Sequence, residues 1–180
     1  VGGEESYGYL VSDFVRDKDA LISCSMIAEA TAWAKSNGMS LMDVLIEIYL
    51  KFGFYKEDLI SITKKGKAGA DEIKEMMETY RKNPPLEINH SQVVEIRDYK
   101  LSVQKNIVSG HEEKIDMPTS DVIQFFTADG SKITVRPSGT EPKIKFYFGI
   151  KEHLKDKSDF DRANQAAQLK IKEIITSLGL

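Results

Sequence analysis

The feature that most constrains the fold is a strict alternation of apolar and polar residues near the C-terminus. Ile133 and Val135 alternate with polar neighbours, and the same period of two returns from Ile144 to Ile150. A period of two places apolar side chains on one face of a strand and polar side chains on the other. The sequence therefore predicts two antiparallel strands with one face on a core and the other face in water.

Two further strands complete the predicted sheet. Residues 122–127 precede Asp129-Gly130, a two-residue hairpin signal that leads into the alternating strands. Residues 93–97 form a short run rich in Val and Ile, which favour extended structure. The interval 98–119 is polar and irregular. We therefore predict an α+β fold with a four-stranded antiparallel sheet and helices packed on one face.

Helical periodicity marks four segments. Residues 20–36 and 40–52 form two helices joined by a short turn, and such a pair must pack on another layer. We expect them to be the mainly helical remnant of an α/β domain. Residues 70–82 form a third helix, and the last begins at a Ser158 cap and runs to the C-terminus.

A basic, glycine-rich interval at 64–69 is the clearest break in the pattern. It predicts a linker between a domain over 1–63 and a second domain over 70–180. Residues 54–61, just before the break, fit either a strand or an extended connector. The chain also starts abruptly in a loop-like stretch, so we expect a piece of a longer protein.

Composition excludes several classes of function. The 180 residues carry a net charge of −3, so the basic footprint of a nucleic-acid-binding protein is missing. The apolar runs are too short to span a bilayer, and the first residues lack the pattern of a signal peptide. The single cysteine, Cys24, permits no internal disulfide and lies in an apolar helical pattern. We expect a buried, inert thiol and a cytoplasmic protein.

The richest polar stretch lies between the two alternating strands. It reads Arg136-Pro137-Ser138-Gly139-Thr140-Glu141-Pro142-Lys143, and we call residues 136–143 the anion loop. Guanidinium, ammonium and hydroxyl groups suit phosphate oxygens, and glycine lets a backbone N–H approach a ligand closely. Strand parity directs Arg136 and Lys143 away from the core. The pattern favours a phosphate site, and the alternative is a polar surface turn.

The N-terminal residues carry a second polar loop. Glycines flank Glu4, Glu5 and Ser6, with tyrosines at positions 7 and 9. Carboxylates accept hydrogen bonds from sugar hydroxyls, and a Tyr ring covers the apolar face of a pyranose. An ordinary polar turn is the alternative. Asp17 and Asp19 offer too few oxygens for a hard cation, and we interpret one of them as the cap of the next helix.

The anion loop resembles the phosphate-binding loop of the α-D-phosphohexomutase superfamily. Residues 3–9 resemble that family's sugar-binding loop, in the same order along the chain, and residues 13–20 resemble the phosphoglucomutase-2-like branch. The resemblance covers the whole chain. It implies the end of the family's third, sugar-binding domain followed by all of its fourth, phosphate-binding domain.

The resemblance implies an isomerase, an intramolecular phosphotransferase of carbohydrate metabolism. Such enzymes interconvert hexose 1-phosphate and hexose 6-phosphate through a bisphosphorylated sugar, with an active-site phosphoserine and Mg²⁺. Glucose 1,6-bisphosphate would serve as intermediate and activator. The distal phosphate would be bound by Arg136, Ser138, the Gly139 N–H and Thr140, with Lys143 as a weaker candidate. Glu4 and Ser6 would contact the sugar.

The family's phosphoserine loop and metal loop are missing from this sequence. The resemblance therefore implies no catalytic and no metal-binding residue here, and no turnover by this chain alone. The partners it implies are a hexose phosphate and the N-terminal domains of the same protein. A stand-alone phosphosugar-binding module and a structural protein with incidental polar loops are the alternatives. Glucose, mannose and pentose phosphates all remain open as substrates.

Overall fold

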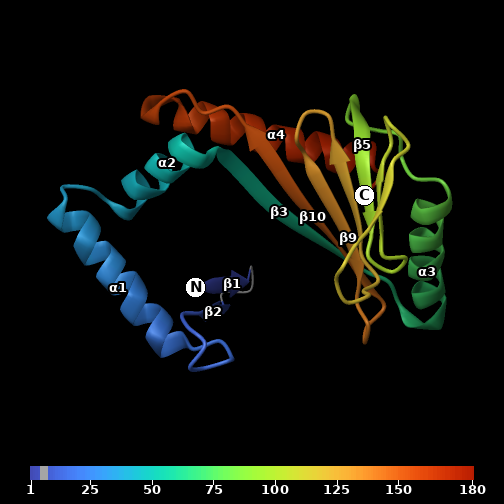
Figure 1. Cartoon of the computed structure of the whole chain (residues 1–180), viewed down its shortest axis with the longest axis horizontal. Coiled ribbons are helices and arrows are strands. Elements are labelled where there is room, and N and C mark those ends of the chain that lie inside the picture. The colour runs from blue at the N-terminus through green and yellow to red at the C-terminus, as the bar shows by residue number, and fades with distance from the viewer. Residues whose placement is uncertain (5–7) are drawn as a thin grey trace. The chain divides into compact units, whose positions relative to one another are not determined.

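The computed structural model describes residues 1–4 and 8–180, which form two compact units divided between Phe52 and Gly53. The N-terminal unit, coloured blue to cyan in Figure 1, holds a two-stranded antiparallel ribbon and two helices. Its elements are β1 (Gly2–Glu4), β2 (Gly8–Leu10), α1 (Ala20–Ser36) and α2 (Leu41–Phe52).

Both helices of this unit begin at side-chain caps, and the cap of the first helix is one of the two aspartates that the sequence offered. The Asp19 carboxylate accepts a hydrogen bond of 2.9 Å from the Ile22 N–H. The Ser40 N–H donates to Asp43 at 2.8 Å, and the Asp43 N–H donates to the Ser40 hydroxyl at 3.2 Å, which is a capping box. Cys24 is exposed, so the prediction of a buried thiol is wrong. The helical period buries the neighbouring Ser23 instead.

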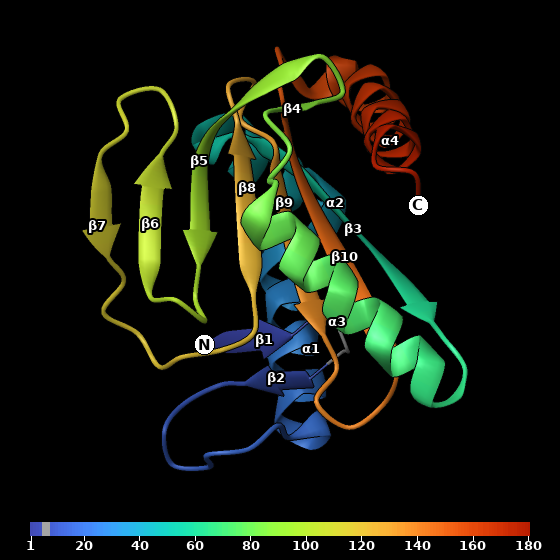
Figure 2. The ribbon, with the colours of Figure 1, turned by 90° about the vertical axis from the view of Figure 1, so that its right-hand side faces the viewer.

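The C-terminal unit is built on one antiparallel sheet of eight strands (Figure 2). The order across the sheet is β3-β10-β9-β8-β5-β6-β7, and β4 pairs with β5 outside this path. The strands are β3 (Phe54–Thr63), β4 (Glu87–Ile88), β5 (Ser91–Asp98), β6 (Val103–Asn106), β7 (Glu112–Lys114), β8 (Ile123–Thr127), β9 (Lys132–Pro137) and β10 (Lys143–Glu152).

The α+β class is confirmed, but the sheet is wider than the predicted four strands. β6 and β7 fall in the interval 98–119, which we expected to be irregular. These two short strands at one end of the sheet carry mostly polar side chains and are held by backbone pairing, so their composition lacks the strand signal.

The boundary between the two parts of the chain also differs from the prediction. β3 pairs with β10 along its whole length, from Thr63 opposite Lys143 to Phe54 opposite Glu152. Residues 54–63 therefore belong to the C-terminal unit. The interval 64–69 is no linker, because Gly66 already begins α3. The interval resembles a linker in sequence because it is rich in glycine. Gly66 takes a φ of +66° at the turn into the helix, a conformation that favours glycine.

Two helices, α3 (Gly66–Lys82) and α4 (Phe160–Ser177), cover one face of this sheet. The Tyr80 ring of α3 lies 5.7 Å from Phe125 and 6.4 Å from Phe146, centroid to centroid. On α4, the Phe160 ring lies 5.7 Å from Phe54. The buried side chains of the alternating strands lie on this same face, as the period of two predicts.

The start of the last helix is corrected as well. Asp156, rather than Ser158, is the cap, because its carboxylate accepts from the N–H groups of Ser158 and Asp159. A 3₁₀ turn over Lys157–Asp159 then leads into α4. No helix among the described residues is long and apolar enough to cross a membrane.

The second face of the sheet carries the polar members of the alternating strands, and no helix of this unit packs on it. Cross-strand register places Arg136 and Thr134 of β9 on this face, opposite Lys145 and Tyr147 of β10. Gln124 of β8 stands next to Thr134 in the same row. We call this surface the open face.

Candidate functional site: the anion loop and its cations

The anion loop closes the hairpin between β9 and β10. Pro137 is the last residue of β9 and stands opposite Ile144. Beyond it the Ser138 N–H donates to the Lys143 carbonyl at 2.7 Å, and the Lys143 N–H donates to the Glu141 carbonyl at 2.8 Å. A further bond of 2.8 Å, from the Lys64 N–H to the Pro142 carbonyl, ties the loop to the end of β3. Because both ends are held, the loop presents a defined set of donors.

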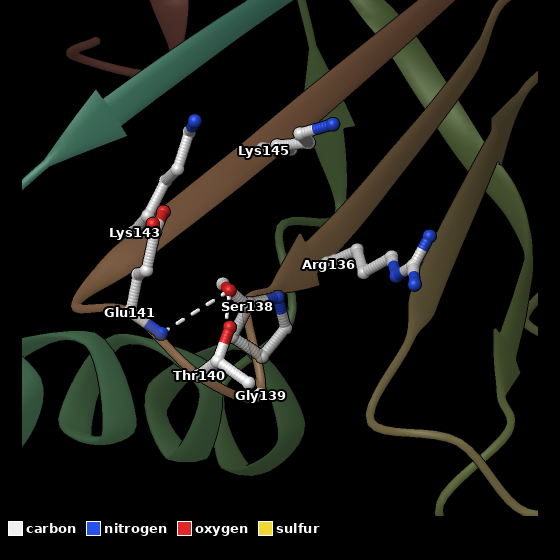
Figure 3. A pocket seen from close by; sticks show the side chains of 8 residues that line it. Arg136, Ser138, Gly139, Thr140, Glu141, Lys143 and Lys145 are labelled. Carbon is white, nitrogen blue, oxygen red and sulfur yellow. Dashed lines mark hydrogen bonds between the residues drawn. The ribbon is translucent and has the colours of Figure 1, made fainter. Parts of the chain in front are cut away.

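Ser138 organises the tip of the loop. Its hydroxyl oxygen accepts hydrogen bonds from the N–H groups of Thr140 at 3.4 Å and Glu141 at 3.3 Å (Figure 3). A hydroxyl has one proton to donate and two lone pairs to accept with. Since the lone pairs face the loop's own N–H groups, the proton of Ser138 remains for an external acceptor.

Gly139 lies between these residues and is exposed. Its φ is outside the left-handed region, and no heavy atom lies within 4 Å of the position that a Cβ would take. The fold of the loop therefore does not require a glycine here. Open space over the backbone is what a ligand oxygen needs in order to reach the Gly139 N–H.

Three cations surround a cavity of about 380 Å³ at this loop. Arg136 ends β9, Lys145 stands directly opposite it on β10, and Lys143 lies two residues earlier with the same parity. Among the described residues of the lining, Glu141 is the single carboxylate. Figure 3 shows Arg136 and Lys145 extending to the same side of their strands. The excess of positive charge suits an anion with more than one negative charge.

All five predicted phosphate ligands line this cavity: Arg136, Ser138, Gly139, Thr140 and Lys143. Our sequence interpretation omitted Lys145, although its parity with Lys143 was visible in the alternation. The register with Arg136, which comes from strand pairing, is what makes Lys145 part of the site.

The predicted sugar-binding residues lie in the N-terminal unit. Glu4 is the last residue of β1 and pairs with Gly8 of β2, while Ser6 lies outside the described residues. A cavity of about 350 Å³ in this unit is lined by the ribbon glycines and by Arg16, Asp17 and Lys18. Among the described residues, no three His, Cys, Asp or Glu side chains form a group that could hold a metal ion, so these residues do not fit a Mg²⁺ site.

Two family models match this chain. Residues 1–52 match the phosphoglucomutase/phosphomannomutase alpha/beta/alpha domain III, and residues 94–158 match the phosphoglucomutase/phosphomannomutase C-terminal domain. The first range coincides with the N-terminal unit. The second contains the anion loop and most of the sheet.

Curated relatives agree with these matches. A phosphoglucomutase of Staphylococcus aureus strain MRSA252 is 40% identical over 148 residues, which are 82% of this chain and 27% of the relative. A phosphoglucomutase of Staphylococcus saprophyticus is 35% identical over 147 residues, 82% of this chain and 26% of the relative. The chain thus spans about a quarter of the length of these relatives.

Solved structures support the fold. The open form of pp63/parafusin, a phosphoglucomutase from Paramecium, aligns with 96% of this chain and 30% of its own, with a TM-score of 0.50 and 16% identity. The two family models and the curated relatives together show that the chain belongs to the phosphoglucomutase/phosphomannomutase family, that is, to the α-D-phosphohexomutase superfamily.

Proposed function

We propose that this chain is the substrate-binding part of a phosphohexomutase that interconverts hexose 1-phosphate and hexose 6-phosphate. The observation that carries the proposal is the clustering of Arg136, Lys143 and Lys145 with the donors of the anion loop around one cavity. These groups hold the phosphate that is not reacting. Arg136 supplies a fork of N–H donors, and the lysines add charge.

A bisphosphorylated intermediate explains why a site of this kind is useful. The intermediate turns over between the two half-reactions, so each phosphate occupies the anion loop in turn. Because the donors of the loop all bind phosphate oxygens, the loop accepts the phosphate at either end of the sugar. Glu4 and Ser6 are proposed to contact the sugar hydroxyls. In the whole protein the phosphoserine transfers the phosphoryl group, and Mg²⁺, when bound there, neutralises its charge.

The described residues supply binding, and we propose that they do not turn substrate over alone. The transition state is stabilised by interactions that are realised only when all contributing groups surround the substrate. A chain that carries part of these groups binds phosphosugar weakly, with dissociation constants on the order of millimolar.

The test is a titration of this chain with inorganic phosphate, followed through the amide NMR signals of Gly139 and Thr140. We expect both signals to move, and Arg136→Ala to weaken binding by about 10- to 100-fold, because a charge-assisted contact is lost. Lys132→Ala, on the same strand and face but outside the cavity, is the matched control. If both amide signals stay unchanged at a phosphate concentration about 20 times a millimolar dissociation constant, the phosphate assignment is refuted.

The assignment can be checked in the catalytic reaction as well. In the whole enzyme, the same Arg136→Ala substitution should lower kcat/KM for glucose 1-phosphate by a similar factor. An Arg136→Ala enzyme with unchanged kcat and KM would contradict a role of the anion loop in the reaction.

A further inference from the structure

The open face continues from the anion loop without interruption, and it carries an ordered row of polar and aromatic side chains. The row lies one step along the strands from Arg136 and Lys145. It consists of Thr134, which pairs with Tyr147 on β10, and of Gln124, which pairs with Thr134 on β8. Two residues along a strand correspond to about 7 Å, so the row begins next to the phosphate site.

A chain of hydrogen bonds runs along this row. The Tyr99 hydroxyl donates to Gln124 Oε1 at 3.1 Å, and Gln124 Nε2 donates to Thr134 Oγ1 at 3.2 Å. Both hydroxyls can donate or accept, so the two hydrogen bonds are satisfied with the Gln124 amide in either orientation. In both orientations Gln124 uses one hydrogen-bonding position of the Thr134 hydroxyl and leaves other positions for a ligand.

Within the completely described range 53–180, Gln124 is the hydrogen-bond partner of the Thr134 side chain. Thr134 is partly exposed on the open face, with the partly exposed Tyr147 ring opposite it across the strands. The Lys145 ammonium lies 5.9 Å from the centroid of that ring. An aromatic ring, a hydroxyl held by Gln124 and a cation of the anion-loop cavity therefore lie together in one patch.

We propose that this patch, formed by Thr134 and Tyr147, binds the sugar ring of the hexose phosphate whose phosphate occupies the anion loop. The inference rests on the proposed function of that loop. The sugar ring is joined to its phosphate through an ester oxygen, so a phosphate at Arg136 and Lys145 brings the ring to the next row. The Tyr147 ring covers an apolar sugar face, and the Thr134 hydroxyl forms a hydrogen bond with a sugar hydroxyl.

The patch does not distinguish the two ends of the sugar by charge, because the Thr134 hydroxyl is neutral. It favours a ring with a hydroxyl group at that position over a phosphorylated ligand without a ring. Inorganic phosphate fills the anion loop alone. The ligand class assigned to the patch is therefore a pyranose phosphate, and inorganic phosphate is the natural comparison.

The experiment is a pair of NMR titrations of this chain, one with inorganic phosphate and one with glucose 6-phosphate. We expect both ligands to move Gly139 and Thr140, and only glucose 6-phosphate to move Thr134 and Tyr147. If both ligands move the loop and neither moves the patch, the sugar inference fails and the phosphate assignment stands. If neither ligand moves the loop, the proposed function itself fails.

Three variants of the patch and one control variant sharpen the test. Thr134→Val removes the hydroxyl at nearly constant volume and should weaken glucose 6-phosphate by about 2- to 10-fold, with phosphate binding unchanged. Thr134→Ser keeps the hydroxyl and should restore most of the affinity. Tyr147→Leu should weaken the sugar phosphate to a similar degree. Tyr55→Leu, on the same face at the far end of β3, is the control. Equal losses for both ligands in Thr134→Val would overturn the inference.

Discussion

Arg136 and Lys145 stand directly opposite each other on β9 and β10, on the face of the sheet that no helix of the C-terminal unit covers. Two like charges in register on neighbouring strands are destabilising unless an anion or solvent compensates them. Both side chains line the cavity at the anion loop. Their pairing makes Lys145 as important to our proposal as the predicted Arg136.

Replacing Lys145 with Ala should weaken phosphate binding by about 5- to 30-fold, because one cation next to the ligand is lost. The dependence of the affinity on salt concentration should also become shallower, since fewer charges contribute. Calorimetric titration with phosphate at two salt concentrations measures both effects. Lys151→Ala on the same strand and face is the control. A Lys145→Ala chain with normal affinity would remove this residue from the site.

Gly139→Ala separates folding from binding. The free energy of unfolding, followed through the thermal midpoint, should change by less than about 0.5 kcal/mol. A Cβ at this position meets no atom within 4 Å, and φ lies outside the left-handed region. Phosphate affinity should fall by about tenfold if the ligand reaches the Gly139 N–H. Gly130→Ala offers the opposite behaviour. Its φ of +82° is strained for alanine, so about 1 kcal/mol of stability should be lost with phosphate binding intact. Unchanged affinity in Gly139→Ala would contradict a backbone contact.

Asp129 links the β8–β9 hairpin to α4. Its carboxylate bonds to the Lys170 ammonium at 2.8 Å and accepts from the hydroxyls of Thr127 and Ser131. Partial burial raises the pKa of Asp129, but these hydrogen bonds outweigh it and hold the pKa well below its usual range.

A depressed folded-state pKa stabilises the native protein above the unfolded pKa of about 4, and the contribution is lost as the pH falls toward the folded value. Asp129→Asn should therefore cost about 1 kcal/mol at neutral pH and less in acid, after allowance for solvent screening. Urea unfolding at pH 7 and pH 3 measures the difference. Asp116→Asn, at an exposed loop position, is the control. Equal losses at both pH values would contradict the assignment.

Arg81 and Asp98 form a largely buried ion pair in the C-terminal unit, with side chains 8% and 11% exposed. The Arg81 Nε donates to Asp98 at 2.9 Å, and its Nη2 donates to Asp121. Arg81→Met should cost about 3 kcal/mol or more, because Asp98 would be left as an uncompensated buried charge. Lys82→Met, at an exposed neighbouring position, should cost less than about 0.5 kcal/mol. Chemical denaturation compares the two. Similar stabilities would show that Asp98 finds solvent or other partners.

Much of the fold followed from short-range patterns. The alternation in β9 and β10 predicted the sheet, its buried face and the direction of Arg136 and Lys143, because side-chain parity is a local property of a strand. The caps at Asp19 and Ser40 are also local, since the donor and acceptor lie within three residues.

The predictions were wrong where pairing between strands far apart in the sequence determines the structure. β6 and β7 are short polar strands at one end of the sheet, and β3 joins the sheet through a partner about ninety residues away in the chain. The turn into α3 was interpreted as a linker because glycine is favoured both where φ is positive, as at Gly66, and in flexible connectors. The cap at Asp156 was missed because a 3₁₀ turn separates it from α4.

The sequence by itself determined the chemistry of the candidate phosphate site. Arg136, Ser138, Gly139 and Thr140 are consecutive or nearly so, and a loop closed by its own backbone needs no distant residue to bring them together. The tertiary structure decided which other side chains join them. Lys145 faces Arg136, and Thr134 is hydrogen-bonded to Gln124, only because β8, β9 and β10 pair in one particular register. Register depends on packing across the whole sheet, which no local pattern contains.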